Sequence, residues 1–109
     1  MKKKNIRVWV KEPRKPAELK MMPNTLKALQ ETVGGYIETV TLFDDAVFIC
    51  DEEGLLKNTP FNFRLCGHFF FGTVIFAGVY GDEFCDHPMQ DEDEMKLMFP
   101  ELFKVGEKK

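Results

Sequence analysis

The sequence lacks any apolar run close to the roughly 20 residues that a membrane-spanning helix requires, so we expect no membrane span. Its basic first residues are followed by only three apolar residues, 8–10, which is too short a core for a secretory signal peptide. Cysteine is scarce: three residues at unrelated spacings argue against a disulfide framework and favour a reducing compartment. These absences together predict a cytoplasmic protein.

The sequence also lacks the short motifs of common catalytic sites, since it contains no nucleophile elbow, no phosphate-binding loop and no dinucleotide fingerprint. Cys50 lies in an apolar run and is expected in the core, where a thiol is inert. The acidic residues of the central part fall at expected turns, where carboxylates are solvated and not paired for acid–base chemistry. We therefore expect a protein that is not an enzyme.

What remains has the composition of one globular domain. The 109 residues, 44% hydrophobic and 30% charged, are enough for one hydrophobic core. Alternating or continuous apolar patterns predict strands at residues 5–10, 17–22, 36–42, 46–50 and 69–79, with a further extended segment within residues 55–65.

Two helices are predicted from their end signals. One begins after an N-cap at Asn24 and ends at Gly34, and the other begins at Asp91 and stops before Pro100. We expect a single small α+β domain over residues 1–109, with a mostly antiparallel sheet of about five strands and two helices, in the order β-β-α-β-β-(β)-β-α. Residues 1–5 and 104–109 are expected to be flexible ends.

Residues 69–79 form the most apolar segment, and both faces of the predicted strand are apolar. Such a strand must be covered on both sides, by helices or by another subunit. With eleven phenylalanines, the chain carries more apolar surface than 109 residues easily hide. The sequence therefore predicts a binding protein that forms a homo-oligomer or docks on an unidentified host protein or small ligand.

Charge is distributed unevenly along the chain. Residues 1–20 hold eight basic groups against two acidic ones, a net +6, whereas the other residues hold seven basic and sixteen acidic groups, a net −9. One interpretation is a basic arm that binds nucleic acid. The other is that these charges line solvated faces, because a nucleic-acid-binding domain usually has a basic total.

Two Cys-x-His pairs are the most conspicuous group of metal-ligating residues: Cys66, His68, Cys85 and His87. They offer two sulfurs and two nitrogens, the donors that a tetrahedral zinc site accepts, and residues i and i+2 of a strand share a face. Their spacing differs from that of common zinc knuckles, so two reduced thiols and two loop histidines are the other interpretation. We expect no cofactor, with zinc as the alternative.

Asn62 and Arg64 lie two residues apart among Phe61, Phe63 and Leu65. In an extended segment the two polar residues would share one face and the phenylalanines the other. Arg64 beside an apolar wall would bind a carboxylate or phosphate, or it would clamp the acidic turn at residues 51–53.

Residues 26–38 (LKALQETVGGYIE), residues 51–54 (DEEG) and Asn62-x-Arg64 before Gly72 resemble a domain-of-unknown-function family found in phages and mobile elements of Firmicutes and other gut bacteria. The resemblance runs over nearly the whole chain. It implies a small cytosolic accessory protein of a mobile element, a kind of protein that commonly binds a host component. Tyr36, from the first block, joins Asn62 and Arg64 as a candidate binding residue.

Overall fold

The computed structural model describes residues 4–104 of the chain. Its helices and strands are β1 (Asn5–Lys11), β2 (Glu18–Pro23), α1 (Leu26–Val33), β3 (Ile37–Val40), β4 (Ala46–Asp51), β5 (Phe61–Leu65), β6 (His68–Phe71), β7 (Val74–Tyr80), β8 (Glu83–Cys85), α2 (Glu92–Met98) and the 3₁₀ helix η1 (Pro100–Phe103).

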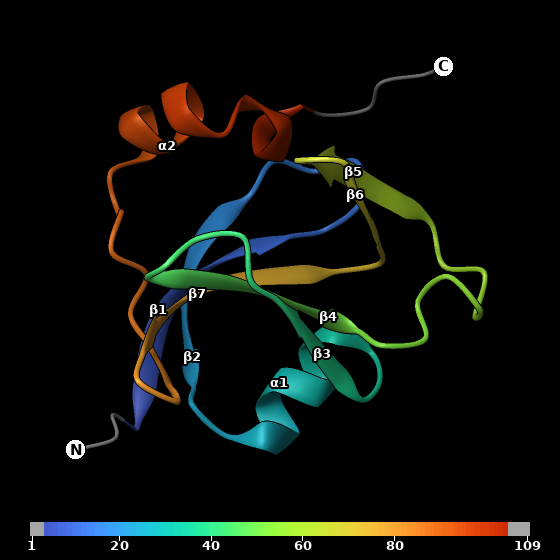
Figure 1. Ribbon diagram of the computed structural model, residues 1–109, viewed down its shortest axis with the longest axis horizontal. Coiled ribbons are helices and arrows are strands. Elements are labelled where there is room, and N and C mark those ends of the chain that lie inside the picture. The colour runs from blue at the N-terminus through green and yellow to red at the C-terminus, as the bar shows by residue number, and fades with distance from the viewer. Residues whose placement is uncertain (1–3, 105–109) are drawn as a thin grey trace.

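An antiparallel sheet of six strands forms the centre of the molecule, in the order β2-β1-β7-β4-β3, with β8 paired to β7. β5 and β6 form a separate two-stranded sheet. Figure 1 shows α1 on one side of the main sheet and α2 with the β5–β6 hairpin on the other. The predicted α+β domain is confirmed, and the main sheet has one strand more than expected.

The central strands β4 and β7 carry two hydrophobic cores because their side chains alternate between the faces. Val47, Ile49 and Ile75 pack on the side of α1. Phe48 and Phe76 pack on the other side, where their rings stack with centroids 4.0 Å apart. The apolar run at residues 46–50 therefore belongs to a strand that is covered on both faces, as the sequence predicts.

The prediction of one strand over residues 69–79 is wrong. Gly72 has φ 76° and ends β6, and the chain turns there into β7. A glycine adopts this left-handed conformation at no steric cost, so two short strands replace one long strand. Residues 74–78 are buried within the chain itself, so β7 needs no second subunit to cover it.

Two further details differ from the sequence prediction. The N-cap of α1 is Thr25, whose side chain accepts a hydrogen bond from Ala28 N, while Asn24 is buried and its Nδ2 donates to Phe84 O at 3.2 Å. The strand β8 was not predicted from the sequence. A Cβ at Gly78 in β7 would clash with Asp86 O just after β8, so only glycine permits this close return of the chain.

The ends of both helices otherwise follow their signals. Gly34 caps α1 with φ 92°, and Asp91 caps α2 by accepting hydrogen bonds from Asp93 N and Glu94 N. Residues 1–3 and 105–109, which were expected to be flexible, lie outside the described residues, while Asn5 pairs with Pro23 in the sheet. Within residues 4–104, no helix has the length and apolar character to cross a bilayer.

Candidate functional site

The β5–β6 hairpin lies over the main sheet, and one of the two faces of the hairpin is buried against that sheet. Phe63 and Phe70 stack with ring centroids 4.6 Å apart, and Phe70 lies 5.0 Å from Phe48 of β4. The two strands are joined by Cys66-Gly67, with φ 52° and 78°. Positive φ at both positions is the geometry of a tight type I′ hairpin turn.

The opposite face of the hairpin presents aromatic rings to solvent. Phe61 and Phe69 are 52% and 56% exposed. The ring of Phe61 lies 6.2 Å from that of Phe69 and 5.7 Å from that of the half-buried Phe71, both edge to face. Arg64 places its guanidinium 5.4 Å from the centre of the Phe69 ring. We call these four residues, Phe61, Arg64, Phe69 and Phe71, the outer aromatic face.

This arrangement corrects the prediction that Phe61 and Phe63 share a face. The register between the two strands shifts between Phe61 and Phe63, which marks a β-bulge. A bulge breaks the alternation of side chains, so Phe61 joins Arg64 on the outer face while Phe63 is buried. Asn62 points toward the interior and does not lie beside Arg64.

Asn62 fastens the hairpin to β1 through Lys11. Its Nδ2 donates to Lys11 O at 2.8 Å and to Gly72 O at 2.7 Å, and its Oδ1 accepts from Lys11 Nζ at 2.9 Å. Lys11 is only 3% exposed, and burial lowers the pKa of its ammonium. Both ends of the Asn62 amide are therefore used within the protein, and this residue is structural.

An open pocket of about 380 Å³ lies beside the hairpin, between β6, the end of β4 and the loop that follows β4. One wall is apolar and aromatic and consists of Leu55, Phe69, Phe70 and Phe71. The rest of the lining is formed by Glu38, Cys50, Asp51, Glu52, Gly54, Gly67 and His68. Glu38 and Cys50 are direct partners in the β3–β4 pairing, so their side chains lie on the same face of the sheet.

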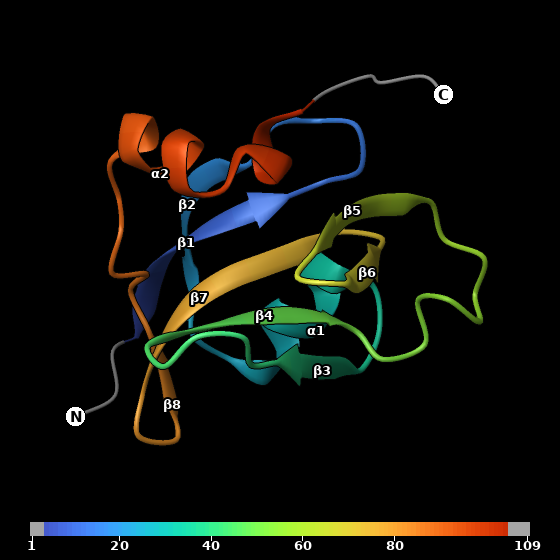
Figure 2. The ribbon, with the colours of Figure 1, turned by 45° about the horizontal axis from the view of Figure 1, so that its top comes forward.

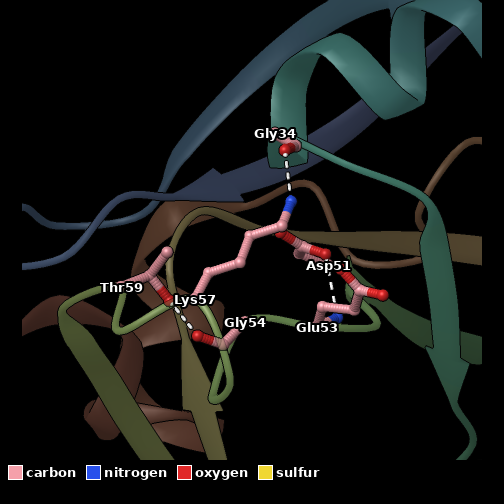
Figure 3. A network of polar contacts seen from close by, with 6 residues as sticks. All are labelled: Gly34, Asp51, Glu53, Gly54, Lys57 and Thr59. Atoms are coloured by element: carbon pink, nitrogen blue, oxygen red, sulfur yellow. Dashed lines mark hydrogen bonds and ion pairs between the residues drawn. The ribbon is translucent and has the colours of Figure 1, made fainter.

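The loop that borders the pocket is held by a network around Asp51 (Figure 3). Lys57 Nζ binds Asp51 Oδ2 at 2.9 Å and donates to Gly34 O at 3.1 Å. Glu53 N donates to Asp51 Oδ1 at 2.9 Å, and Thr59 Oγ1 donates to Gly54 O. Lys57, which the sequence analysis did not single out, thus has the clamping role considered for Arg64.

Opposing effects set the acidity of Asp51. Burial alone would raise the pKa of its carboxyl, but the hydrogen bond from Glu53 N and the hydrogen bond and charge of Lys57 outweigh burial and lower it. The same contact raises the pKa of Lys57. Both groups stay charged at neutral pH, and the ion pair anchors the loop to the end of α1.

Cys50 lies at the pocket but is not activated as a nucleophile. Burial raises the pKa of its thiol to about 11, and the negative charges of Glu38 and Asp51 act in the same direction. A thiol with this pKa is almost entirely protonated at neutral pH, whereas nucleophilic cysteines have a lowered pKa.

The four Cys and His residues considered for zinc lie in different surroundings. Cys66 and His68 are exposed at the tip of the hairpin, Cys85 is half-buried in β8, and His87 is buried. Figure 2 shows β8 at the lower left of the molecule, away from β6, which lies right of the centre. Within residues 4–104, no group of three or more His, Cys, Asp or Glu side chains is arranged to hold a metal ion.

His87 is a histidine of the core. Met89 N donates to its Nδ1 at 3.0 Å, its ring lies 4.2 Å from that of Phe76, and its Nε2 has no hydrogen-bond partner among the described residues. Burial lowers its pKa to about 4, although the contact with Met89 and the charge of Asp45 act in the opposite direction. The imidazole is therefore neutral at physiological pH.

Tyr36, the third candidate binding residue, presents its side chain to solvent and is 68% exposed. Its carbonyl oxygen accepts a hydrogen bond from Glu52 N at 2.9 Å, which ties the residue to the loop beside the pocket. The structure thus places Tyr36 and Arg64 on the surface, whereas Asn62 is half-buried and hydrogen-bonded within the protein.

Comparison with known proteins gives one match. Neither the curated proteins nor the solved structures contain a match to this chain. The family described as "Domain of unknown function (DUF3846)" matches residues 6–100, nearly the whole chain. This confirms the resemblance to a domain-of-unknown-function family, and the chain belongs to the DUF3846 family.

Proposed function

We propose that this protein is a non-catalytic binding protein that contacts its partner through the outer aromatic face of the β5–β6 hairpin. The observation that supports this most directly is the exposure of Phe61 and Phe69 in one continuous cluster of rings. Clustered exposed aromatic residues mark interaction surfaces, and aromatic residues with arginine dominate the energetics of interfaces. In this proposal the protein acts in the cytoplasm as an accessory of a phage or mobile element.

Three other exposed apolar side chains lie on three separate elements. Met21 lies on β2, Tyr80 at the end of β7 and Leu97 on α2, and single exposed residues of this kind are ordinary on protein surfaces. In the hairpin, by contrast, a bulge is needed to turn Phe61 outward. β-Bulges are over-represented next to functional sites, where they change the direction of a side chain. The bulge at Phe61 therefore favours a function for the outer aromatic face.

The first partner to test is a second copy of the chain, because two copies of this face would cover each other's rings around a two-fold axis. We expect light scattering coupled to size-exclusion chromatography to show a mass that rises from monomer to dimer with concentration. Phe61→Ser should shift the equilibrium toward monomer by at least about tenfold, since fully burying a phenylalanine side chain contributes roughly 1.5–3 kcal/mol.

Tyr80→Ser is the matched control, because Tyr80 is aromatic and 84% exposed but lies outside the outer aromatic face. It should leave the association unchanged, and circular dichroism should show that both variants are folded. A monomer at every concentration would reject self-association through this face.

The basic residues of the N-terminal region give less support to a nucleic-acid-binding role. Lys11 is buried. Two other lysines form ion pairs within the protein: Lys15 Nζ lies 3.4 Å from Glu12 Oε1, and Lys20 Nζ lies 3.6 Å from Glu18 Oε1. This role predicts retention on heparin that falls steeply with salt. Absence of retention even at low salt would remove it.

A further inference from the structure

The pocket beside the hairpin combines an aromatic wall with two carboxylates, those of Glu38 and Glu52, that form no ion pair within residues 4–104. We infer that this pocket binds a ligand in which a cationic group, a protonated amine or a guanidinium, is attached to an apolar or aromatic body. The inference deepens the proposed function, and rests on it, because it names the chemistry that the hairpin side of the molecule would recognise.

The apolar part of the ligand would contact the wall formed by Leu55 and residues 69–71. Leu55 is 70% exposed and Phe69 is 56% exposed, so the ligand would remove apolar surface from water. The volume of about 380 Å³ falls within the range of roughly 300–1,000 Å³ that is usual for ligand sites. The pocket therefore has room for a small aromatic molecule.

The charged part of the ligand would lie near Glu38 and Glu52. Both residues line the pocket and both are exposed. Among residues 4–104, the ion pairs involve Glu12, Glu18, Asp51 and Glu92 and not these two carboxylates. Asp51 is already neutralised by Lys57, so the negative charge available to a ligand is that of Glu38 and Glu52.

The thiol of Cys50 reports the sign of the potential in the pocket. The charges of Glu38 and Asp51 add to burial in raising the pKa of Cys50, which means that its surroundings disfavour a further negative charge. Burial, the largest cause, disfavours a charge of either sign, whereas the smaller contribution of the negative charges disfavours an anionic ligand and favours a cation.

Aromatic rings at the pocket add a second attraction for a cation. A cation is drawn to the face of an aromatic ring, and Arg64 already lies over Phe69 in this way on the outer side of the hairpin. His68 completes the aromatic lining, with its ring 4.8 Å from that of Phe70. A ligand that carries both features would satisfy the carboxylates and the rings at once.

A titration followed by ¹H–¹⁵N NMR tests the inference with three probes of nearly equal shape: 2-phenylethylammonium, neutral 2-phenylethanol and anionic 3-phenylpropanoate. We expect the amine to shift the amide signals of Glu38, Glu52 and Phe69, with weaker binding of the alcohol and no binding of the acid. Equal binding of the three probes, or shifts elsewhere in the protein, would overturn the inference.

Variants then identify the carboxylates. The double variant Glu38→Gln with Glu52→Gln should weaken binding of the amine by at least about threefold and leave the alcohol unchanged, because each exposed ion pair has a small effect. Glu83→Gln is the matched control, since Glu83 is an exposed acid in β8 outside the pocket. Weaker amine binding by Glu83→Gln would contradict the assignment. Unchanged amine binding by the double variant would contradict it as well.

A further titration distinguishes two sources of the cationic group, a free amine and the side chain of a partner protein. The dipeptide acetyl-Arg-Phe-amide presents the same chemistry as part of a peptide, and tighter binding of the dipeptide than of 2-phenylethylammonium would identify a peptide source. The titrations are repeated with Phe61→Ser, since Phe61 does not itself line the pocket, although its ring contacts those of Phe69 and Phe71, which do. Selective amine binding by this variant would support the pocket even if self-association fails.

Discussion

Within residues 4–104, four polar side chains are buried, and their surroundings differ: Lys11, Asn24, Asp51 and His87. Lys11 and Asp51 each have hydrogen-bond partners for the group that carries the charge. His87 differs, because it is buried with one ring nitrogen that has no partner among the described residues. This makes His87 the interior group most sensitive to its protonation state.

We predict that protonation of His87 destabilises the fold between about pH 6.5 and pH 4. Its pKa falls from 6.5 to about 4 on folding, so the unfolded chain binds the proton more tightly. Stability is therefore greatest above pH 6.5 and declines as the pH falls, by on the order of 3 kcal/mol at the lower limit. Urea unfolding at several pH values measures this decline directly.

The matched variant for this experiment is His87→Phe, which keeps an aromatic ring against Phe76 and cannot be protonated. Its stability should vary much less with pH in the same window. Asp51 also loses stabilising contacts in acid, because its pKa is lowered, but it does so below its ordinary value of 3.8, outside the window. An equal decline in the variant would show that another group is responsible.

At the scale of the elements, the β5–β6 hairpin is defined by its bulge. The bulge separates the roles of Asn62 and Arg64, which the sequence would place on one face. Asn62 holds three hydrogen bonds between the hairpin, Lys11 and Gly72, whereas Arg64 is exposed with its guanidinium over the ring of Phe69. The first residue therefore holds the hairpin in place, and the second is available to a partner.

This difference predicts unequal effects of two similar substitutions. Asn62→Leu should lower the free energy of unfolding by about 1–3 kcal/mol, because the buried Lys11 ammonium loses its bond to Asn62 Oδ1 and keeps the one to Glu12 O, while the carbonyls of Lys11 and Gly72 lose the Asn62 donor. Arg64→Leu should change it by less than about 0.5 kcal/mol, as is usual for surface positions. Chemical denaturation measures both, and a larger loss for Arg64→Leu would contradict the assigned roles.

The sequence predicts the elements that have a periodic signal and misses those that depend on a single turn. The strands around Val8 and Phe48 and the helix that ends at Gly34 carry alternation or capping residues, and they lie where expected. The break at Gly72 and the bulge at Phe61 leave no periodic trace, because each depends on the backbone angles of one or two residues. The turn at Cys66 was missed because cysteine is unusual at a positive φ.

The candidate site was predictable only in part for the same reason. Arg64 and Tyr36 were identified as candidate binding residues and both are exposed. Glu38 and Leu55 were not identified, because they meet at the pocket only after β3, β4 and β6 have come together. Pairing between distant segments decides which side chains share a pocket, and a single sequence carries no direct signal of it.

At the scale of the whole molecule, the two cores share their strands. Phe48 and Ile49 are neighbours in β4 yet belong to opposite cores, and Ile75 and Phe76 of β7 are divided in the same way. Neither core persists without the strands that form the other. The sheet therefore couples α1 on one side to α2 and the hairpin on the other.

This coupling predicts that the protein unfolds in a single cooperative transition. Trp9 is the only tryptophan and reports on the core beneath α2, since its Nε1 donates to Met89 O at 2.8 Å and its ring lies 5.8 Å from that of Phe103. Far-ultraviolet circular dichroism reports on the sheet and both helices. The two signals should give the same midpoint and slope in urea, as two-state unfolding requires. If the segment with α2 and η1 were only loosely attached, Trp9 fluorescence would change at a lower urea concentration than the dichroism, and the sheet would not be the unit that unifies the fold.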